Sequence, residues 1–349
     1  MTKMIKFSGI GPFKSGLAPI KQKRKWGFIN KLGDFEIPCE YDLVYFPYNE
    51  GKIAVKKNKK WGYITTENIA VTDFIYDDVS PFLDGLASVK QGKKYGIINV
   101  LGKMIIQPIY SMIKQSPNQI FSAKKDKKWG VIDNIGNIIL PFIYDSMTEF
   151  SHGVSYVCIG QKHGFINLQG KFVLELTSKQ YVYPIDFHKN FEARINFEFI
   201  AIVDKKGGRK YDWSIYSNKG ELTADSLKYN WINSFHDDLA AVCSYDKRKW
   251  GMINSLGQQV ISCEYDNISP FLCGLAFASK GIYCGYIDKN NQIKIPFKYK
   301  LVSTFYDNVA FVSPDGWNGH LIDTEANVIL NLRKEKTLNN IFDYISIYK

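Results

Sequence analysis

Short stretches in which apolar and polar residues alternate recur along the whole chain. Each stretch follows an aromatic residue and a small turn, as in residues 82–89 and 271–278. A polar, lysine-rich segment comes next, and then a second alternating stretch that is rich in β-branched and aromatic residues. Alternation with a period of two is typical of strands with one buried face. The pattern therefore predicts an antiparallel β-hairpin that is repeated many times.

The second strand of each predicted hairpin begins with a Trp-Gly pair or a variant of it. The first four pairs are spaced by 35, 34 and 34 residues, and degenerate pairs at Trp213-Ser214 and Gly319-His320 bring the count to nine repeats. A large aromatic residue in such a strand is more often a core residue than part of a ligand-stacking row. The structural repeat anchors are Trp26, Gly27, Trp61, Gly62, Tyr95, Gly96, Trp129, Gly130, Gly164, Trp250, Gly251 and Gly285.

A tight turn and a short apolar strand follow each anchor. Seven residues after the Trp position lies a Gly, or an Asn at Asn68 and Asn291, which tolerates a left-handed backbone. An Asn or Asp three residues earlier is expected to cap this turn. The third strand is predicted to end at Pro38, Pro141 or Pro296, because proline has no backbone donor. Three or four strands fill a repeat and leave no room for a helix.

The expected fold is all-β: a tandem array of hairpin repeats that forms an open superhelix or solenoid. Propeller-like closure is the alternative, and the irregular step of 50 residues between His163 and Trp213 argues against it. Apolar residues at i, i+3, i+4 and i+7 from Leu338 to Ile345 predict a short C-terminal capping helix. The predicted segments are 1–171 (repeats one to five), 172–204 (an irregular insert or distorted repeat), 205–330 (repeats six to nine) and 331–349 (helical cap).

The combined pattern resembles the bacterial WG (or KWG) repeat. It reads Phe-x-x-Gly-Leu-Ala-x-Val, a polar segment, Lys-Trp-Gly-x-Ile-Asn/Asp-x-x-Gly and Ile-Pro-x-x-Tyr-Asp, and it extends from about Phe13 to Leu330. Ser214 and His320 depart from it at the glycine position. The resemblance implies an all-β repeat protein with a binding or scaffold role, and it transfers no catalytic residue.

The positive charge is concentrated in one part of the repeat. The net charge is +11, and 24 of the 45 basic residues lie in the turns before the anchors, with only three acidic residues. Such turns could form a basic ridge that binds nucleic acid or another polyanion. The alternative is that the lysines block edge pairing and keep a β-rich protein in solution. The candidate polyanion-binding residues are Lys23, Arg24, Lys57, Lys59, Lys60, Lys93, Lys94, Lys125, Lys127, Lys128, Lys247 and Arg248.

No residues with metal-ligand or catalytic spacing are found. The six cysteines contain no C-x-x-C pair, and no histidine has a second His or Cys at metal spacing. The repeated Tyr-Asp could line a groove of carboxylates, but it also serves as a turn signal. We therefore expect no enzyme activity, no metal and no cofactor. The expected function is a scaffold for protein–protein or other macromolecular interaction, and polyanion binding is the alternative.

The expected partner is another protein, with nucleic acid or another polyanion as the second possibility. No stretch approaches the ~20 apolar residues of a membrane span, and no signal peptide precedes the first repeat. We expect a cytoplasmic protein. The oligomeric state stays open.

Overall fold

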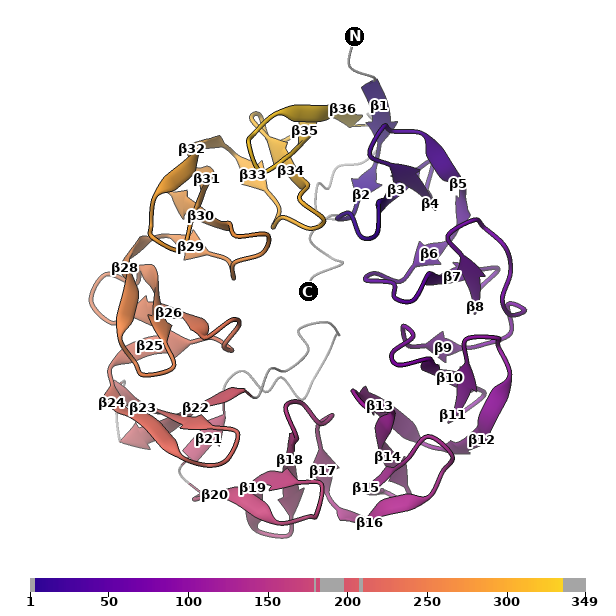
Figure 1. Cartoon of the computed structure of the whole chain (residues 1–349), viewed down its shortest axis with the longest axis vertical. Helices are drawn as coiled ribbons and strands as arrows, with labels where there is room; N and C mark the ends of the chain where they lie inside the picture. The colour runs from indigo at the N-terminus through magenta and orange to yellow at the C-terminus, as the bar shows by residue number, and fades with distance from the viewer. Residues whose placement is uncertain (1–3, 179, 183–197, 207–209, 335–349) are drawn as a thin grey trace. The chain divides into compact units, whose positions relative to one another are not determined.

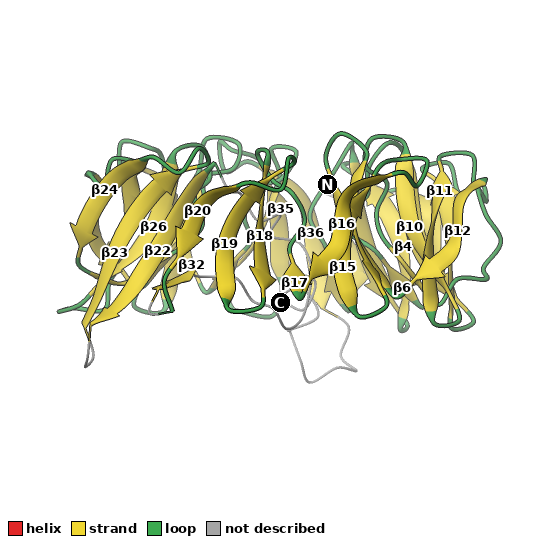
Figure 2. Ribbon diagram, turned by 90° about the horizontal axis from the view of Figure 1, so that it is seen from below, coloured by secondary structure: helices red, strands yellow, loops and turns green. Residues whose placement is uncertain are grey.

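The described residues form β-strands joined by turns and loops, and they contain no helix (Figure 2). The computed structural model describes residues 4–178, 180–182, 198–206 and 210–334. The all-β, repeat-based prediction is confirmed. The chain divides into two compact units. One comprises Met1–Arg24, Phe28–Phe35 and Lys179–Lys349, and the other comprises Lys25–Gly27 and Glu36–Ser178.

Each repeat forms a small sheet, and we number the sheets one to nine along the chain (Figure 1). Sheet one contains β2 (Gly9–Ile10), β3 (Leu17–Gln22), β4 (Lys25–Asn30) and β5 (Phe35–Tyr41). Sheet two contains β6 (Leu43–Val44), β7 (Lys52–Lys57) and β8 (Lys60–Thr65). Sheet three contains β9 (Asp78–Val79), β10 (Leu86–Gln91), β11 (Lys94–Asn99) and β12 (Met104–Tyr110). Sheet four contains β13 (Met112–Ser116), β14 (Ile120–Lys125), β15 (Lys128–Ile132) and β16 (Ile138–Tyr144). Sheet five contains β17 (Ser146–Met147), β18 (Val154–Ile159), β19 (Lys162–Asn167) and β20 (Phe172–Leu176).

The second half of the chain repeats this arrangement. Sheet six contains β21 (Gln180–Val182), β22 (Phe199–Lys206), β23 (Lys210–Ser217) and β24 (Leu222–Leu227). Sheet seven contains β25 (Tyr229–Ile232), β26 (Leu239–Ser244), β27 (Trp250–Asn254) and β28 (Gln259–Tyr265). Sheet eight contains β29 (Asn267–Ile268), β30 (Ala276–Lys280), β31 (Tyr283–Ile287) and β32 (Ile293–Tyr299). Sheet nine contains β33 (Leu301–Val302), β34 (Ala310–Ser313), β35 (Gly319–Ile322) and β36 (Val328–Lys334), with β1 (Met4–Phe7) beside β36.

Four antiparallel strands in chain order are the typical content of a sheet. In sheet three the order is β12-β11-β10-β9, so each strand pairs with its neighbour in the chain. The first strand is short, follows the Tyr-Asp pair and is absent from the sequence prediction. Four-stranded antiparallel sheets of this kind are the blades of β-propellers.

The predicted third strand of a repeat is the fourth strand of its sheet in the structure, and it does not end at its proline. This finding corrects the sequence prediction. Strands β5, β16 and β32 continue through Pro38, Pro141 and Pro296 to a buried tyrosine. Because this strand is at the edge of its sheet, a missing N–H on the outward side costs no ladder bond. The pairing of β15 with β16 also shifts register at this point, as expected for a bulge.

The bulge explains the glycine of the Trp-Gly pair. A Cβ added at Gly130 would lie closer than 3.0 Å to the carbonyl oxygen of Leu140 in the fourth strand, ten residues later. At five further anchor glycines, an added Cβ would also lie closer than 3.0 Å to a carbonyl oxygen of the fourth strand. These are Gly27, Gly96, Gly164, Gly251 and Gly285. Any side chain there would push the fourth strand away.

The predicted turns between the third and fourth strands are confirmed. Gly102 has a φ of 76° and Asn68 has a φ of 63°, both in the left-handed region. The side-chain oxygen of Asn99 accepts hydrogen bonds from the backbone N–H groups of Leu101 and Lys103, at 3.1 and 3.0 Å. This Asx cap fixes the turn, as the sequence predicts.

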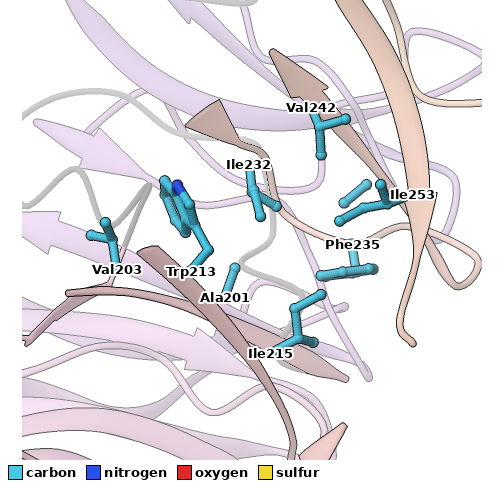
Figure 3. Close-up of a cluster of buried hydrophobic side chains, with 9 residues drawn as sticks. Ala201, Val203, Trp213, Ile215, Ile232, Phe235, Val242 and Ile253 are labelled. Carbon is cyan, nitrogen blue, oxygen red and sulfur yellow. The ribbon is translucent and has the colours of Figure 1, made fainter. Parts of the chain in front are cut away.

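Consecutive sheets share a hydrophobic core within each compact unit. Sheets six and seven meet through nine buried residues, among them Trp213, Ile215 and Phe235 (Figure 3). The cluster forms although Ser214 replaces the anchor glycine of this repeat. Equivalent clusters join sheets seven and eight, and sheets eight and nine. In the other compact unit they join sheets two to five.

The first and last described strands lie in one sheet, because β1 pairs in parallel with β36 (Figure 1). Gly16 of repeat one donates its N–H to Asp307 of repeat nine at 2.8 Å, as Gly85 donates to Glu50 one repeat earlier. Repeat nine thus contacts repeat one as it would contact a following repeat. An open superhelix has no such contact, so the structure favours the propeller-like alternative over the predicted solenoid.

The irregular segments are now located. Of residues 172–204, β20 is the fourth strand of sheet five, while β21 and β22 are the first two strands of sheet six. Residues 183–197, between β21 and β22, fall within this longer step and lie outside the described part. Of the expected helical cap, residues 331–334 belong to β36, and residues 335–349, with the predicted helix, lie outside the described part.

Candidate functional site

Turns between the second and third strands of a sheet, which we call tips, contain most of the lysine-rich segments in the described part of the chain. Lys59 and Lys127 are the second residues of two-residue turns and have φ values of 67° and 70°. Asn58 and Asp126 before them also have positive φ, as in type I′ turns. Gly92 opens another tip with a φ of 61°. All twelve candidate polyanion-binding residues lie in or next to tips.

Aspartates of the Tyr-Asp pairs link successive tips. The Asp77 carboxylate accepts a hydrogen bond from the Lys60 ammonium, in the tip of sheet two, at 2.5 Å. It also accepts one from the Gly92 N–H, in the tip of sheet three, at 2.7 Å. Asp145 makes the same two contacts with Lys128 and Gly160. The remaining links of this kind are Asp42 with Lys25 and the backbone of Asn58 and Lys59, and Asp266 with Lys249 and Gly281.

These links lower the pKa of the carboxyl groups. The hydrogen bond from Lys60 lowers the pKa of Asp77, and the Gly92 N–H lowers it further. Lys249 and Gly281 act in the same way on the pKa of Asp266. The sequence alone allows two interpretations of these aspartates: they mark turns, or they line a groove of carboxylates. The structure instead places them against the tip lysines, so part of the predicted basic charge is neutralised.

Other tip lysines cover aromatic rings. The Lys56 and Lys124 ammonium groups lie 5.6 and 5.7 Å from the ring centroids of Trp61 and Trp129, and Lys90 lies 5.4 Å from that of Tyr95. Lys57 is paired with Glu40 at 2.7 Å. The anchors and the lysines thus stabilise the sheet together. Polyanion binding by the tips stays a prediction.

At the opposite end of sheets two, three and nine, the turn between the first and second strands carries an acidic residue. Its carboxylate accepts a backbone N–H group of the next repeat, as Glu50 does from Gly85. Asp84 accepts from Asn118 at 2.6 Å, and Asp307 accepts from Gly16. Asp307 also lies 3.8 Å from the ammonium of Lys31. These carboxylates hold neighbouring repeats together.

Exposed isoleucines occupy the fourth strands of sheets three and four. Their exposed fractions range from 37% to 62%. The position before the closing tyrosine is Ile109 in β12, Ile143 in β16 and Ile75 before Tyr76 of repeat two, but Glu40, Glu264 and Lys298 in β5, β28 and β32. Ile75 is 46% exposed and follows sheet two. The set in sheets three and four is Ile105, Ile109, Ile138, Ile139 and Ile143, which we call the isoleucine strip. Sheets three and four pack on each other, so the strip lies on the fourth strands of two neighbouring sheets in one compact unit. The sequence analysis missed it, although an alignment of the repeats shows the substitution.

The remaining candidates have packing roles. His163 stands in the Trp position of repeat five, and its Nδ1 lies 2.9 Å from the Tyr156 hydroxyl. Lys114 donates to the Met147 carbonyl oxygen at 3.0 Å and lies 5.1 Å from the Trp129 ring centroid. Burial lowers the pKa of Lys114. Among the described residues, no three His, Cys, Asp or Glu side chains are grouped to hold a metal, and no helix could cross a membrane.

Seven segments match the family model of the WG containing repeat. Together they cover more than half of the chain. The matched residues are 5–26, 26–61, 61–95, 95–129, 129–162, 250–281 and 285–316. No curated protein matches the sequence.

Several solved structures are distantly similar. A eukaryotic initiation factor is 10% identical, with 92% of this chain and 85% of that chain covered and a TM-score of 0.47. BamB from Moraxella catarrhalis is 10% identical, with coverages of 81% and 94% and a TM-score of 0.41. Kluyveromyces lactis Hsv2 is 10% identical, with coverages of 70% and 92% and a TM-score of 0.41. Likenesses at this level carry no information on what this chain binds.

Proposed function

This chain belongs to the family of proteins built from WG-containing repeats, and we propose that it is a non-enzymatic scaffold that binds another protein. The blade-like sheets support this proposal, because sheets that pack successively present a large, rigid surface at little entropic cost. The carboxylates and lysines of the described residues form links between repeats rather than an asymmetric cluster.

The isoleucine strip carries the proposal. At the position before the closing tyrosine, Glu40 and Glu264 form ion pairs with Lys57 and Lys280, at 2.7 and 2.8 Å. Ile109 and Ile143 stand in the same position and leave apolar surface exposed. A charged residue therefore fits this position, and isoleucine is not required for the fold. Clustered exposed aliphatic side chains are typical of protein-binding surfaces.

The partner is expected to recognise side chains rather than to add a strand. Pro108 in β12 and Pro141 in β16 lie in the middle of the edge strands that carry the strip. A proline removes a donor that an added strand would need. Recognition by an apolar surface of the partner fits this arrangement better than β-augmentation does.

Affinity capture with matched variants tests the proposal. The wild-type chain, the double variant Ile109→Glu/Ile143→Glu and the double variant Lys93→Ser/Lys127→Ser serve as baits in extracts of the source cells. The introduced glutamates copy Glu40 and Glu264, so folding should be preserved. We expect one protein to be retained by the wild type and the lysine variant and lost from the isoleucine variant. A purified candidate should then show a Kd that is at least about tenfold weaker for the isoleucine variant.

Polyanion binding is the competing outcome of the same experiment. If nuclease treatment releases the captured material, or if only the lysine variant loses it, the tips and not the strip are the functional surface. The aspartate links argue against this outcome, because Lys60, Lys128 and Lys249 already have carboxylate partners. If all three baits retain the same proteins, the scaffold proposal fails at this surface.

A further inference from the structure

The tips of sheets eight and nine depart from the pattern that links sheets seven and eight. In that link, Asp266 joins Lys249 to Gly281. At the next pair of sheets, Tyr283 stands in the position of Lys249, and Lys300 stands in the position of Asp266. The lysine and the aspartate are lost together, so no aspartate link of this form joins these two tips. The described residues of both sheets belong to the same compact unit and share a core.

Apolar and aromatic side chains are exposed where the link is missing. Ile282, Tyr283 and Trp317 are 68%, 42% and 57% exposed, and we call these three residues the tip patch. Other tips present lysine or arginine at the equivalent positions, as at Lys59 and Arg248. The structure thus gives two neighbouring tips an apolar surface among basic ones.

Hydrogen bonds fix both tips. The tip of sheet eight is held through the Gly281 N–H, which donates to Asp266 at 2.7 Å. In the tip of sheet nine, Asp315 Oδ1 accepts the N–H groups of Trp317 and Asn318 at 2.7 and 2.8 Å, and the Ser313 hydroxyl at 3.1 Å. These bonds present Trp317 in a set position, which lowers the entropic cost of binding.

The charges around the tip patch favour an anionic ligand. Lys298 lies near the end of sheet eight, in β32, and Lys300 lies between β32 and β33. Lys247 and Arg248 belong to the tip of sheet seven. The neighbouring carboxylates form ion pairs or hydrogen bonds within the protein. Glu264 pairs with Lys280 at 2.8 Å, and Asp315 accepts backbone N–H groups. Asp246 lies among the basic residues of tip seven, where backbone hydrogen bonds lower the pKa of its carboxyl group.

We propose that the tip patch binds the surface of an anionic lipid bilayer. Trp and Tyr side chains prefer the membrane–water interface, and isoleucine can enter the acyl boundary. Lysines around such side chains reach phosphate and carboxylate head groups, since their stems span the interface. Hairpin tips are convex, and a fluid bilayer can receive convex apolar groups, whereas a protein partner would need a matching pocket. This proposal is independent of the isoleucine strip, which belongs to the other compact unit.

Vesicle co-sedimentation with the full chain tests the proposal. The probes are vesicles of phosphatidylcholine alone and of phosphatidylcholine with phosphatidylserine. We expect binding to the anionic vesicles only, and weaker binding at high salt. Because each buried side chain adds apolar transfer energy, Ile282→Ser/Trp317→Ser should lower the apparent affinity at least about tenfold. Leu256→Ser, in an exposed turn at the opposite end of sheet seven, should leave binding unchanged.

A second readout separates insertion from simple charge attraction. Brominated lipids should quench the fluorescence of Trp317, and Trp317→Phe should keep vesicle binding but lose that part of the quenching. The proposal is overturned if the wild type does not sediment with anionic vesicles. It is also overturned if Ile282→Ser/Trp317→Ser binds as well as the wild type, which would indicate a polyanion surface without insertion. Capture of a protein by the tip patch without vesicle binding would overturn it as well.

Discussion

Sheets three and four and sheets eight and nine depart from the common repeat at different positions. In sheets three and four, isoleucines replace charged residues of the fourth strand, at Ile109 and Ile143. In sheets eight and nine, Tyr283 and Lys300 replace the lysine and the aspartate that link the tips of sheets seven and eight. Both pairs keep the turns and the shared cores. Positions that stay constant among the repeats build the fold, and positions that change are available for binding.

The largest effect is expected at a constant position. Gly285→Ala places a Cβ within 3.0 Å of the Ile295 carbonyl oxygen, so the fourth strand of sheet eight must shift. The expected loss of stability is about 3 kcal/mol, because backbone cannot move aside as a side chain can. Chemical denaturation of the purified variant measures it.

Gly274→Ala is the matched control for this change. Gly274 has a φ of 78° and no atom near its would-be Cβ, so the cost is only that of a left-handed alanine, about 1 kcal/mol. Equal losses for the two variants would contradict the bulge explanation of the Trp-Gly pair.

A smaller effect is expected for the aspartate links. Asp266→Ala removes the partner of Lys249 and of the Gly281 N–H, and the melting temperature should fall by roughly 2 °C. Lys300→Ala, at the equivalent position of sheet nine, should leave the melting temperature unchanged. Thermal unfolding followed by circular dichroism measures both melting temperatures. A larger decrease for Lys300→Ala than for Asp266→Ala would contradict the stabilising role of the aspartate link.

The links also predict the direction of a pH dependence. The pKa of Asp266 in the folded state lies below its ordinary value of 3.8, because Lys249 and the Gly281 N–H favour the charged form. Its contribution to stability is therefore complete above pH 3.8 and is lost as the pH falls below that value. Melting curves between neutral and acidic pH should show a steeper loss for the wild type than for Asp266→Asn. Parallel curves would exclude a stabilising link.

The smallest effect on stability is expected at the positions that change. Ile109→Glu and Trp317→Ser alter exposed side chains, so the free energy of unfolding should stay within about 0.5 kcal/mol of the wild type. Denaturation midpoints measure this. A large loss from either change would show a structural role and would weaken the assignment of that surface to binding.

Much of the local structure could be predicted from the sequence, because it depends on short-range rules. The turn at Gly102, its cap by Asn99 and the strand around Trp129 all follow from residue type and spacing. The short first strands were missed because two residues, as at Leu43–Val44, are too few to show alternation. The sequence predicts a strand end at Pro141, because it does not show that β16 is an edge strand.

Contacts between repeats could not be predicted in the same way. Lys60 and Asp77 are 17 residues apart, and their pairing depends on how one sheet packs on the next. The pairing of β1 with β36 joins strands at opposite ends of the described chain, and no local pattern encodes it. The long step before Trp213 argued against closure, but the extra residues fall between β21 and β22.

Site-specific photo-crosslinking tests the central claim most directly. A photoreactive amino acid is placed at position 109 of the isoleucine strip and, in a second variant, at position 298, which is the equivalent position in sheet eight. The scaffold proposal predicts that position 109 crosslinks to one partner protein in the source cells and that position 298 does not. Equal crosslinking from both positions, or from position 298 alone, would contradict it.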